Sequence, residues 1–436
     1  MKPQARIQAA IDLIGAIRNS NTPADLTTTK FFRNRRYMGS QDRRQIGDQT
    51  WQIIRYWARL SWCIQTADGT EPNSRNLVLA NLTILEGLEV IELQALFNGE
   101  QYAPHPLTSR EIGLVERMTK LDLRKSDLPA YVAAECPAWL WPYFTRSFGQ
   151  IAKTEVSALS VEAPVHLRVN TLKSNRAAAR ILLAKDGTIA TNTSLAPFGL
   201  RLETRTPLGR TEAFSAGLVE VQDEGSQIAA LLTDAQRNHV VCDLCAGGGG
   251  KTLALAASMA NRGRIIACDS SKERLSRARK RLKRAGVFNT TTRILDPNSG
   301  NWLRRRARSF DRVLIDAPCS STGTWRRNPY QRWRLLPSEM LEQMKQQDKL
   351  VAKAAPLVKP GGRIVYVTCS LLREENEDRI EAFLEKYKNF RILPVKKIWH
   401  SVFGTHCPTQ DSFLRLSPRL HGTDGFFVAI LERGND

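Results

Sequence analysis

The sequence has little cysteine and no long hydrophobic run. Its 436 residues include only eight cysteines, spread along the chain, which is too few for a disulfide-stapled secreted fold. No stretch approaches the roughly 18 uninterrupted apolar residues of a membrane-spanning helix. Residues 1–20 also lack the apolar core of a signal peptide. We therefore expect a cytoplasmic protein with no membrane association.

Acidic residues are scarce relative to basic ones. The chain has 43 Asp and Glu against 64 Lys and Arg, a formal net charge of +21. This excess predicts a polyanionic partner, most simply nucleic acid, although a merely soluble basic protein is the alternative. The hydrophobic fraction of 42% and the charged fraction of 25% exclude a mostly disordered chain. The length predicts about three domains.

The N-terminal part, residues 1–130, has the periodicity of an all-helical domain. Apolar residues recur at helical spacing near Ile7 and Ile53, and residues 76–97 form a third apolar helical stretch. Thr108 and Glu111 have the spacing of a capping box. Residues 1–60 carry 11 basic and 4 acidic side chains, and five arginines of this region could meet phosphate: Arg33, Arg35, Arg36, Arg43 and Arg44.

Two further parts follow a linker predicted over residues 123–137. Residues 138–217 have the pattern of a small α+β module, with a strand at 165–169, a helix at 175–184 and short strands near Ile189 and Leu200. From residue 218 to 436, short apolar strands alternate with helices, which predicts a parallel sheet covered on both faces. Ligands of such sheets bind beyond the carboxyl ends of the strands.

A glycine-rich loop follows the first predicted strand of this sheet. Cys245 stands where a P-loop needs its first glycine, and Thr252 stands where a dinucleotide fingerprint needs its third, so neither motif fits. A glycine loop after a strand ending in Asp243 suits the adenosyl and amino-acid parts of S-adenosylmethionine. Cys242 and Cys245 have no second ligand pair at metal-site spacing, so we expect buried cysteines and no metal.

Asp269 ends the next predicted strand. An acid about 20 residues after a glycine loop accepts hydrogen bonds from ribose hydroxyls, and an acid here can also cap the following helix. That helix, residues 272–285, carries eight basic residues and one acidic residue. It is either a solvated face or a surface that meets phosphate.

Two cysteines follow two further predicted strands. Cys319 lies three residues after Asp316, and Cys369 lies within Thr368-Cys-Ser370. Each cysteine alone could simply be packed, but basic surroundings favour a nucleophilic thiolate. A thiolate that adds to carbon 6 of cytosine activates carbon 5 for methyl transfer, and an acid near ring nitrogen 3 stabilises the developing charge. A donor loop, an acid and two cysteines therefore fit cytosine 5-methylation.

At these motifs the chain resembles the Nop/Sun (Fmu) family of RNA cytosine-5 methyltransferases. It is most similar to the bacterial 16S ribosomal RNA branch, whose N-terminal helical domain is NusB-like. The shared motifs are Leu167-Arg-Val-Asn-Thr171, Val221-Gln-Asp-Glu-Gly-Ser-Gln227, residues 245–252, Asp316-Ala-Pro-Cys-Ser320, Arg326-Arg-Asn-Pro329, Thr368-Cys-Ser370, Glu374-Glu-Asn376 and Asp424-Gly-Phe-Phe427. The resemblance implies a Rossmann-like catalytic domain over 218–436, preceded by an RRM-like module over 138–217.

The resemblance also implies roles for individual residues. Cys369 would attack carbon 6 and Cys319 would resolve the adduct, although DNA cytosine methyltransferases use the equivalent of Cys319 as nucleophile. Asp316 would orient cytosine and donor with Lys251 nearby. Asp269 would hold the donor ribose, Asp296 would lie near its adenine, and Arg326 and Arg327 would reach RNA phosphate. The full expected donor set is Cys245, Ala246, Gly247, Gly248, Gly249, Gly250, Lys251, Asp269, Arg274, Asp296 and Asp316.

The chain departs from the family pattern at two of these positions. Gly248 stands where the family usually has proline, which restricts a loop more than glycine does. Asp296 follows Leu295, where the family usually has glycine. We expect a monomer that acts on ribosomal RNA. The alternatives are the same chemistry on transfer RNA, a non-catalytic RNA-binding assembly factor, and a P-loop ATPase whose glycine spacing already fails.

Overall fold

The computed structural model describes residues 1–121 and 128–435, and these form two compact units. One unit contains Met1–Val161 together with Trp325–Leu335, and the other contains Glu162–Thr324 and Leu336–Asp436. The start of the predicted linker, residues 123–127, lies outside the described residues. Each unit is considered by itself below.

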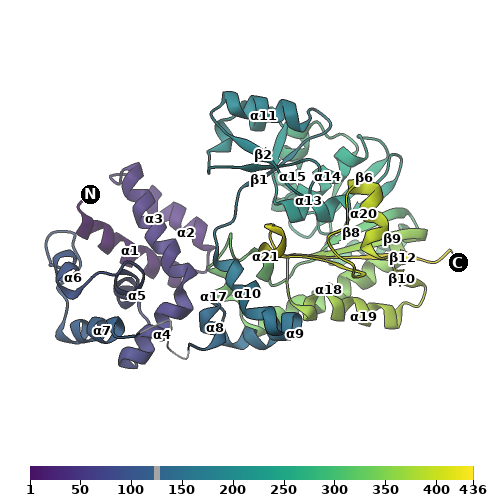
Figure 1. Ribbon diagram of the computed structural model, residues 1–436. Coiled ribbons are helices and arrows are strands. Elements are labelled where there is room, and N and C mark those ends of the chain that lie inside the picture. The colour runs from purple at the N-terminus through teal and green to yellow at the C-terminus, as the bar shows by residue number, and fades with distance from the viewer. Residues whose placement is uncertain (122–127, 436) are drawn as a thin grey trace. The chain divides into compact units, whose positions relative to one another are not determined.

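The first unit is helical, as its apolar periodicity predicts (Figure 1). Its α-helices are α1 (Pro3–Arg18), α2 (Ala24–Arg33), α3 (Ser40–Arg55), α4 (Trp57–Asp68), α5 (Ser74–Ala80), α6 (Val90–Leu96), α7 (Ser109–Thr119), α8 (Ala130–Ala133), α9 (Trp141–Phe148), α10 (Ala152–Ser157) and α17 (Gln331–Arg334). The predicted capping box starts α7, where Thr108 accepts from the amide of Glu111 and Glu111 accepts from that of Thr108.

The predicted single helical stretch over residues 76–97 is wrong in its continuity. It consists of α5, a π-helical turn (Asn81–Leu85) and α6. Gly87, with a φ of 74°, and the extended residue Glu89 separate the last two. A left-handed glycine ends a helix readily, so the apolar spacing continues across a break that the periodicity alone does not reveal.

The segment Trp325–Leu335 belongs to the helical unit although it lies far along the chain from the other helices. Arg332 is fully buried and donates to the carbonyl oxygens of Glu135 (2.8 Å) and Leu159 (2.9 Å) and to Ser160 Oγ (3.0 Å). Trp333 Nε1 donates to the carbonyl oxygen of Ile54 at 2.9 Å. The helices of residues 138–161 are part of this unit as well, whereas the sequence pattern groups residues 138–217 as one small module.

The second unit begins with a small antiparallel sheet in the strand order β2-β3-β1-β4. Its strands are β1 (His166–Val169), β2 (Ala190–Asn192), β3 (Gly199–Leu202) and β4 (Val219–Val221), with helices α11 (Arg176–Lys185) and α12 (Glu212–Ser215). The strand β4 lies beyond residue 217, the predicted end of this module, because it pairs with β1 rather than with the larger sheet.

The larger sheet of this unit has the order β10-β12-β9-β8-β5-β6-β7, with β11 paired to β12. The strands are β5 (Val240–Asp243), β6 (Arg264–Asp269), β7 (Thr290–Ile294), β8 (Phe310–Asp316), β9 (Val358–Thr368), β10 (Phe390–Ile392), β11 (Leu414–Leu416) and β12 (Phe426–Arg433). The strands from β9 to β7 are parallel to their neighbours, and β12 is antiparallel to β9. The predicted α/β class is therefore confirmed.

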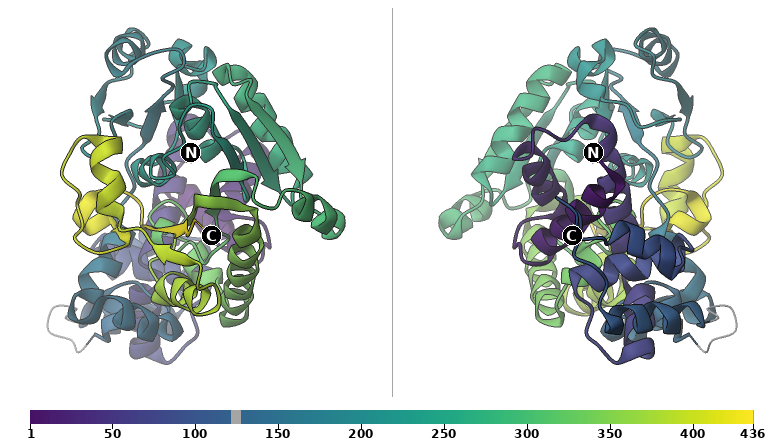
Figure 2. Two further views of the ribbon diagram at one scale, coloured as in Figure 1. Left: turned by 90° about the vertical axis from the view of Figure 1, so that its right-hand side faces the viewer. Right: turned by 90° about the vertical axis from the view of Figure 1, so that its left-hand side faces the viewer.

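Helices cover both faces of this sheet (Figures 1 and 2). They are α13 (Glu224–Leu231), α14 (Gly250–Ser258), α15 (Lys272–Ala285), α16 (Gly300–Arg305), α18 (Pro337–Ala354), α19 (Glu377–Lys386) and α20 (Val395–Phe403), and the short helix α21 (Pro418–His421) precedes β12. Alternate residues of one strand serve opposite cores: Val241 packs with α13, α14 and α20, whereas Cys242 packs with α18 and α19. None of the described helices is long and apolar enough to cross a bilayer.

Candidate methyl-transfer site

Four adjacent strands end in the residues that the sequence singles out. Asp243, Asp269 and Asp316 are the last residues of β5, β6 and β8, and Cys369 directly follows β9. These four strands are parallel neighbours in the order β9-β8-β5-β6. The sheet therefore brings together side chains spaced over more than a quarter of the sequence at one edge.

The glycine loop connects β5 to α14 and needs its glycines at two positions. Gly247 and Gly249 have φ values of 53° and 80°, which residues with a side chain rarely adopt. A Cβ on Gly249 would also lie 3.0 Å from the Cβ of Ala278 in α15, whereas a Cβ on Gly247 would meet open space. The loop thus packs closely against α15 at Gly249 and leaves open space beside Gly247.

Asp269 organises this loop from the neighbouring strand. Its Oδ2 accepts from the amide of Gly247 at 2.8 Å, and its Oδ1 accepts from the amide of Ser271 at 2.8 Å. The helix cap that the sequence allowed for Asp269 is supplied by Ser271, whose Oγ accepts from the amide of Arg274 at 3.2 Å. Each oxygen of Asp269 keeps a second lone pair, so the carboxylate can still accept from ribose hydroxyls.

Asp243 is a site residue to which the sequence assigned no role. It is fully buried, and burial raises the pKa of its carboxyl group to about 7. Thr252 Oγ1 donates to its Oδ2 at 2.6 Å, while Oδ1 has no partner within the described part of the chain. A buried carboxylate oxygen without a donor suits a ligand that carries hydrogen-bond donors.

Lys251 and Asp316 form an ion pair at the start of α14. The distance from Lys251 Nζ to Asp316 Oδ1 is 2.7 Å, with the lysine side chain 8% exposed and the carboxylate 36% exposed. Lys251 Nζ also lies 5.3 Å from the ring centre of Phe426. The pair holds an accessible carboxylate at the same edge as the two cysteines.

The two cysteines meet at this edge. Cys319 Sγ and Cys369 Sγ are 3.5 Å apart, and Ser321 Oγ lies 3.4 Å from Cys369 Sγ. The hydrogen bond with Cys319 is the largest cause that lowers the pKa of Cys369. Ser321 and Lys251 also lower this pKa, whereas burial and the charge of Asp316 raise it. The same hydrogen bond, together with burial, raises the pKa of Cys319 well above the ordinary thiol value. The geometry therefore favours a Cys369 thiolate beside a neutral Cys319 thiol.

A buried polar network fixes the two cysteine loops. Glu375 Oε1 accepts from the amide of Ser320 at 2.8 Å and from Gln347 Nε2 at 3.1 Å, and Ser320 Oγ donates to Glu375 Oε2. In the second loop, Asn376 Nδ2 donates to the carbonyl oxygen of Ser370 at 2.9 Å. Glu374-Glu-Asn376 is one of the shared motifs to which the resemblance assigned no role. The network shows that Glu375 and Asn376 hold the two loops that carry the cysteines.

The remaining predicted site residues are Asp296, Arg326, Arg327 and Arg274. Asp296 caps a short 3₁₀ turn, where its Oδ1 accepts from Ser299 Oγ at 2.7 Å, and it lines a cavity of about 330 Å³ with Lys353. Arg326 and Arg327 belong to the helical unit, and Arg326 is buried there. The Arg274 side chain is exposed.

The two closely spaced cysteines of the glycine loop differ in their surroundings. Cys242 is fully buried in the sheet and Cys245 is half-buried. Burial is the main cause that raises the pKa of Cys245, which keeps this thiol neutral. Within the described residues, no group of His, Cys, Asp and Glu side chains has metal-binding geometry.

The charge of the edge decides which ligand class fits the glycine loop. Asp243, Asp269 and Asp316 lie close enough that the latter two raise the pKa of the first, and one lysine, Lys251, opposes them. This acidic edge disfavours a polyphosphate and suits a cationic ligand. S-adenosylmethionine carries an ammonium and a sulfonium group, and the unpartnered Asp243 Oδ1 and the open side of the loop fit it. The fold and this edge define the class of S-adenosylmethionine-dependent methyltransferases.

Comparison with known proteins narrows this class. Residues 229–432 match the family described as 16S rRNA methyltransferase RsmB/F, and residues 136–209 match the ferredoxin-like domain of the same proteins. The chain therefore belongs to the RsmB/F family of methyltransferases.

Individual relatives agree with this assignment. The chain is 33% identical over 300 residues to a probable ribosomal RNA small subunit methyltransferase B of Synechocystis sp. and 32% identical over 298 residues to ribosomal RNA small subunit methyltransferase B of Proteus mirabilis. Each match covers 68% of this chain, and 66% and 65% of the relatives' own lengths. The solved structure of PH0851 is 26% identical, covers 99% of both chains and has a TM-score of 0.78.

Proposed function

We propose that this protein methylates carbon 5 of a cytosine in 16S ribosomal RNA, with Cys369 as the covalent nucleophile. The observation that carries the proposal is the contact between two thiols whose pKa values move in opposite directions. Family membership and the names of the relatives, which are small subunit ribosomal RNA methyltransferases, support the substrate.

The chemistry follows from the two cysteines. The Cys369 thiolate forms a bond to carbon 6, and the ring electrons move to carbon 5, which becomes nucleophilic. Bound S-adenosylmethionine supplies the electrophilic methyl group. The carbon 5 proton then leaves and the bond from sulfur to carbon 6 breaks, which restores the aromatic ring. Once Cys369 is bonded to carbon, its negative charge is gone, and with it the largest cause of the raised pKa of Cys319. With that cause removed, Cys319 can release its own proton to water, and the resulting thiolate takes up the carbon 5 proton.

The acids have separate tasks in this proposal. Asp316, held by Lys251, binds the cytosine at its ring nitrogen 3 edge and stabilises the charge that develops there. Asp269 binds the ribose of S-adenosylmethionine. Asp243 Oδ1, which has no partner in the described part of the chain, accepts a hydrogen bond from S-adenosylmethionine. Asp296 contributes to binding the adenine of S-adenosylmethionine, and Arg274 contributes to the binding site of the same molecule.

The remaining assignments concern partners and organisation. We propose that the helical domain, the small module and the catalytic domain act as three parts in binding RNA. The candidates for contact with RNA phosphate are Arg327 and the exposed basic side chains of α15. We further propose that the protein is a monomer and works in the cytoplasm.

The experiment that tests the proposal is transfer of labelled methyl groups from S-adenosylmethionine to small subunit ribosomal RNA and, separately, to transfer RNA. Wild type is compared with Cys369→Ala, Cys319→Ala and a matched control, Cys407→Ala, which removes a half-buried thiol of the same unit. Denaturing gels detect covalent protein–RNA adducts, and bisulfite sequencing of the labelled RNA locates 5-methylcytosine.

We expect Cys369→Ala to lose transfer and form no adduct, Cys319→Ala to accumulate an adduct, and Cys407→Ala to behave as wild type. An adduct in Cys369→Ala but not in Cys319→Ala reverses the two roles. Label found only in transfer RNA would show that the substrate is transfer RNA and not 16S ribosomal RNA. Tight RNA binding without transfer to either RNA by the wild type supports the non-catalytic alternative instead.

A further inference from the structure

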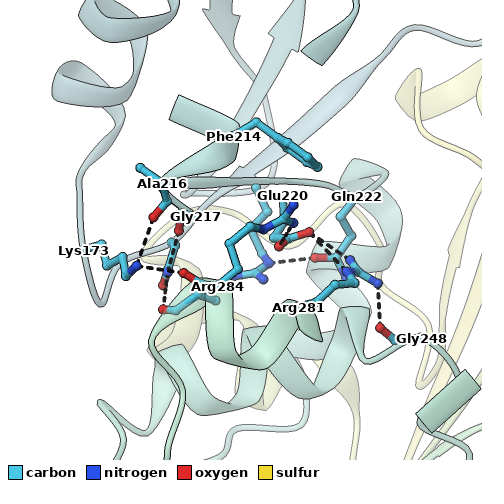
Figure 3. A network of polar contacts seen from close by, with 12 residues as sticks. Lys173, Phe214, Ala216, Gly217, Glu220, Gln222, Gly248, Arg281 and Arg284 are labelled. Carbon is cyan, nitrogen blue, oxygen red and sulfur yellow. Dashed lines mark hydrogen bonds and ion pairs between the residues drawn. The ribbon is translucent and has the colours of Figure 1, made fainter. Parts of the chain in front are cut away.

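The donor loop of this chain is held from outside by an arginine of α15. Gly248 accepts a hydrogen bond on its carbonyl oxygen from Arg281 Nη1 at 2.7 Å (Figure 3). A Cβ built on Gly248 would lie 3.3 Å from the same nitrogen. The guanidinium therefore occupies the space next to the position where a proline ring would begin.

Arg281 is itself fixed by a buried carboxylate of the small module. Glu220, in β4, is 2% exposed, and its Oε2 accepts from Arg281 Nε at 3.3 Å and from Arg281 Nη2 at 3.1 Å. Arg284, one turn further along α15, pairs with Oε1 of the same carboxylate. A buried carboxylate paired in this way costs much free energy to disturb, so Arg281 has a defined position.

The charges around Glu220 explain why the arginine also bonds to the loop. Arg168 is buried near Glu220, and burial lowers the pKa of its guanidinium to about 10. Its Nε donates to Gln222 Oε1 at 2.7 Å. Three guanidinium groups thus surround one carboxylate, which cannot accept from all their N–H groups. The unused donor of Arg281 is satisfied by the Gly248 carbonyl oxygen.

Backbone contacts fix α15 against the small module at a second point. Asn170 Nδ2 donates to the carbonyl oxygens of Gly217 (2.9 Å) and Ala285 (2.8 Å), and Lys173 Nζ donates to those of Ala216 (2.9 Å) and Arg284 (2.8 Å) (Figure 3). A Cβ on Gly217 would lie 2.3 Å from the Arg284 oxygen, so the two segments are in direct contact. The helix that supports the donor loop is thereby clamped to the small module.

We propose that Arg281, held by Glu220, is a positioning residue for the methyl donor. It restrains the four-glycine loop through the Gly248 carbonyl oxygen, and the small module, which holds Arg281 through Glu220, thereby becomes part of the methyl-donor site. The inference rests on the proposed function, since it assumes that the loop binds S-adenosylmethionine. Removal of one hydrogen bond to a charged group from a binding loop predicts an affinity loss of about tenfold or more.

The test measures binding rather than turnover. S-adenosylhomocysteine is titrated calorimetrically into wild type, Arg281→Met, Arg281→Lys and Glu220→Gln. The matched control is Arg279→Met, which removes an exposed arginine from the same helix. Thermal melting of each variant reports folding separately. Gly248→Pro is then added to Arg281→Met, because Gly248, unlike Gly247 and Gly249, has no positive φ that would exclude proline.

We expect Arg281→Met to raise the dissociation constant about tenfold, Arg281→Lys and Glu220→Gln to raise it less, and Arg279→Met to leave it unchanged. Gly248→Pro should recover part of the loss in the Arg281→Met background. An Arg281→Met protein that melts earlier but binds as tightly as wild type overturns the inference, as does a failure of proline to recover any affinity. If wild type itself does not bind S-adenosylhomocysteine, the proposed function fails instead.

Discussion

Cys319 and Cys369 lie 50 positions apart in the sequence, and their Sγ atoms lie 3.5 Å apart in the structure. The pKa of Cys369 is lowered and that of Cys319 is raised, and the hydrogen bond between the two thiols is the largest cause of both shifts. Sequence motifs name both cysteines, and the contact adds a physical difference between two thiols that the motifs leave alike. Four predictions follow from this and from neighbouring contacts.

The first prediction concerns the pH dependence of alkylation. A lowered pKa means that Cys369 becomes a thiolate, and reacts with iodoacetamide, at a lower pH than an ordinary thiol does. Cys319→Ala removes the donating thiol, so the rate profile of Cys369 should move to higher pH. Peptide mass spectrometry of protein alkylated at several pH values measures both profiles. Equal profiles for Cys369 in wild type and in the variant would contradict the assigned hydrogen bond.

The second prediction concerns Lys251. Lys251→Met leaves Asp316 without its ion pair at 2.7 Å and removes a cation that favours the Cys369 thiolate. We expect turnover to fall by about a hundredfold or more, the usual effect of removing a preorganised electrostatic group. Single-turnover methyl transfer measures it, with the exposed Lys349→Met as control. Retention of most of the turnover would show that Asp316 needs no partner.

The third prediction concerns the buried network behind the cysteines. Glu375→Gln replaces one carboxylate oxygen, which accepts hydrogen bonds, with an amide nitrogen, which donates them. The new N–H group then faces the donors of Ser320 and Gln347, so hydrogen bonds are lost. The unmade bonds should cost about 1–3 kcal/mol of unfolding free energy and slow adduct formation, because both cysteine loops depend on the network. Urea unfolding and adduct yield are compared with those of Glu385→Gln, an exposed change in α19. An unchanged stability for Glu375→Gln would exclude the role.

The fourth prediction concerns the segment inserted in the helical unit. Arg332→Met leaves three acceptors without their donor, namely the buried carbonyl oxygens of Glu135 and Leu159 and the half-buried Ser160 Oγ. We expect the helical unit to lose about 3–5 kcal/mol of unfolding free energy. Urea unfolding, monitored by hydrogen exchange of the amides in α8 and α10, measures the loss. The control is Arg36→Met, which replaces an exposed arginine of the same unit. If the two variants were similarly stable, Arg332 would not hold its segment in the helical unit.

The main elements could be predicted because their signals are local. The apolar runs at residues 239–244, 264–268, 312–315, 363–367 and 425–431 became β5, β6, β8, β9 and β12, with ends that differ by a few residues. The strand β7 escaped detection because Thr290–Ile294 is mostly polar and lies at the edge of the sheet, where burial does not demand apolar residues. The break between α5 and α6 escaped because the apolar spacing continues across it.

The sequence by itself determined which side chains stand at the strand ends, since strand, acid and cysteine motifs are contiguous in the chain. Parallel strands then bring these ends to one edge, so the chemistry could be inferred before any distance was known. Tertiary structure alone decided the contact of Cys319 with Cys369, the burial of Asp243, the support of Gly248 by Arg281 and the placement of Trp325–Leu335 among the N-terminal helices. These features depend on groups far apart in the chain, whose pKa values and hydrogen bonds are set by burial and distance, and neither quantity is written in the local pattern of residues.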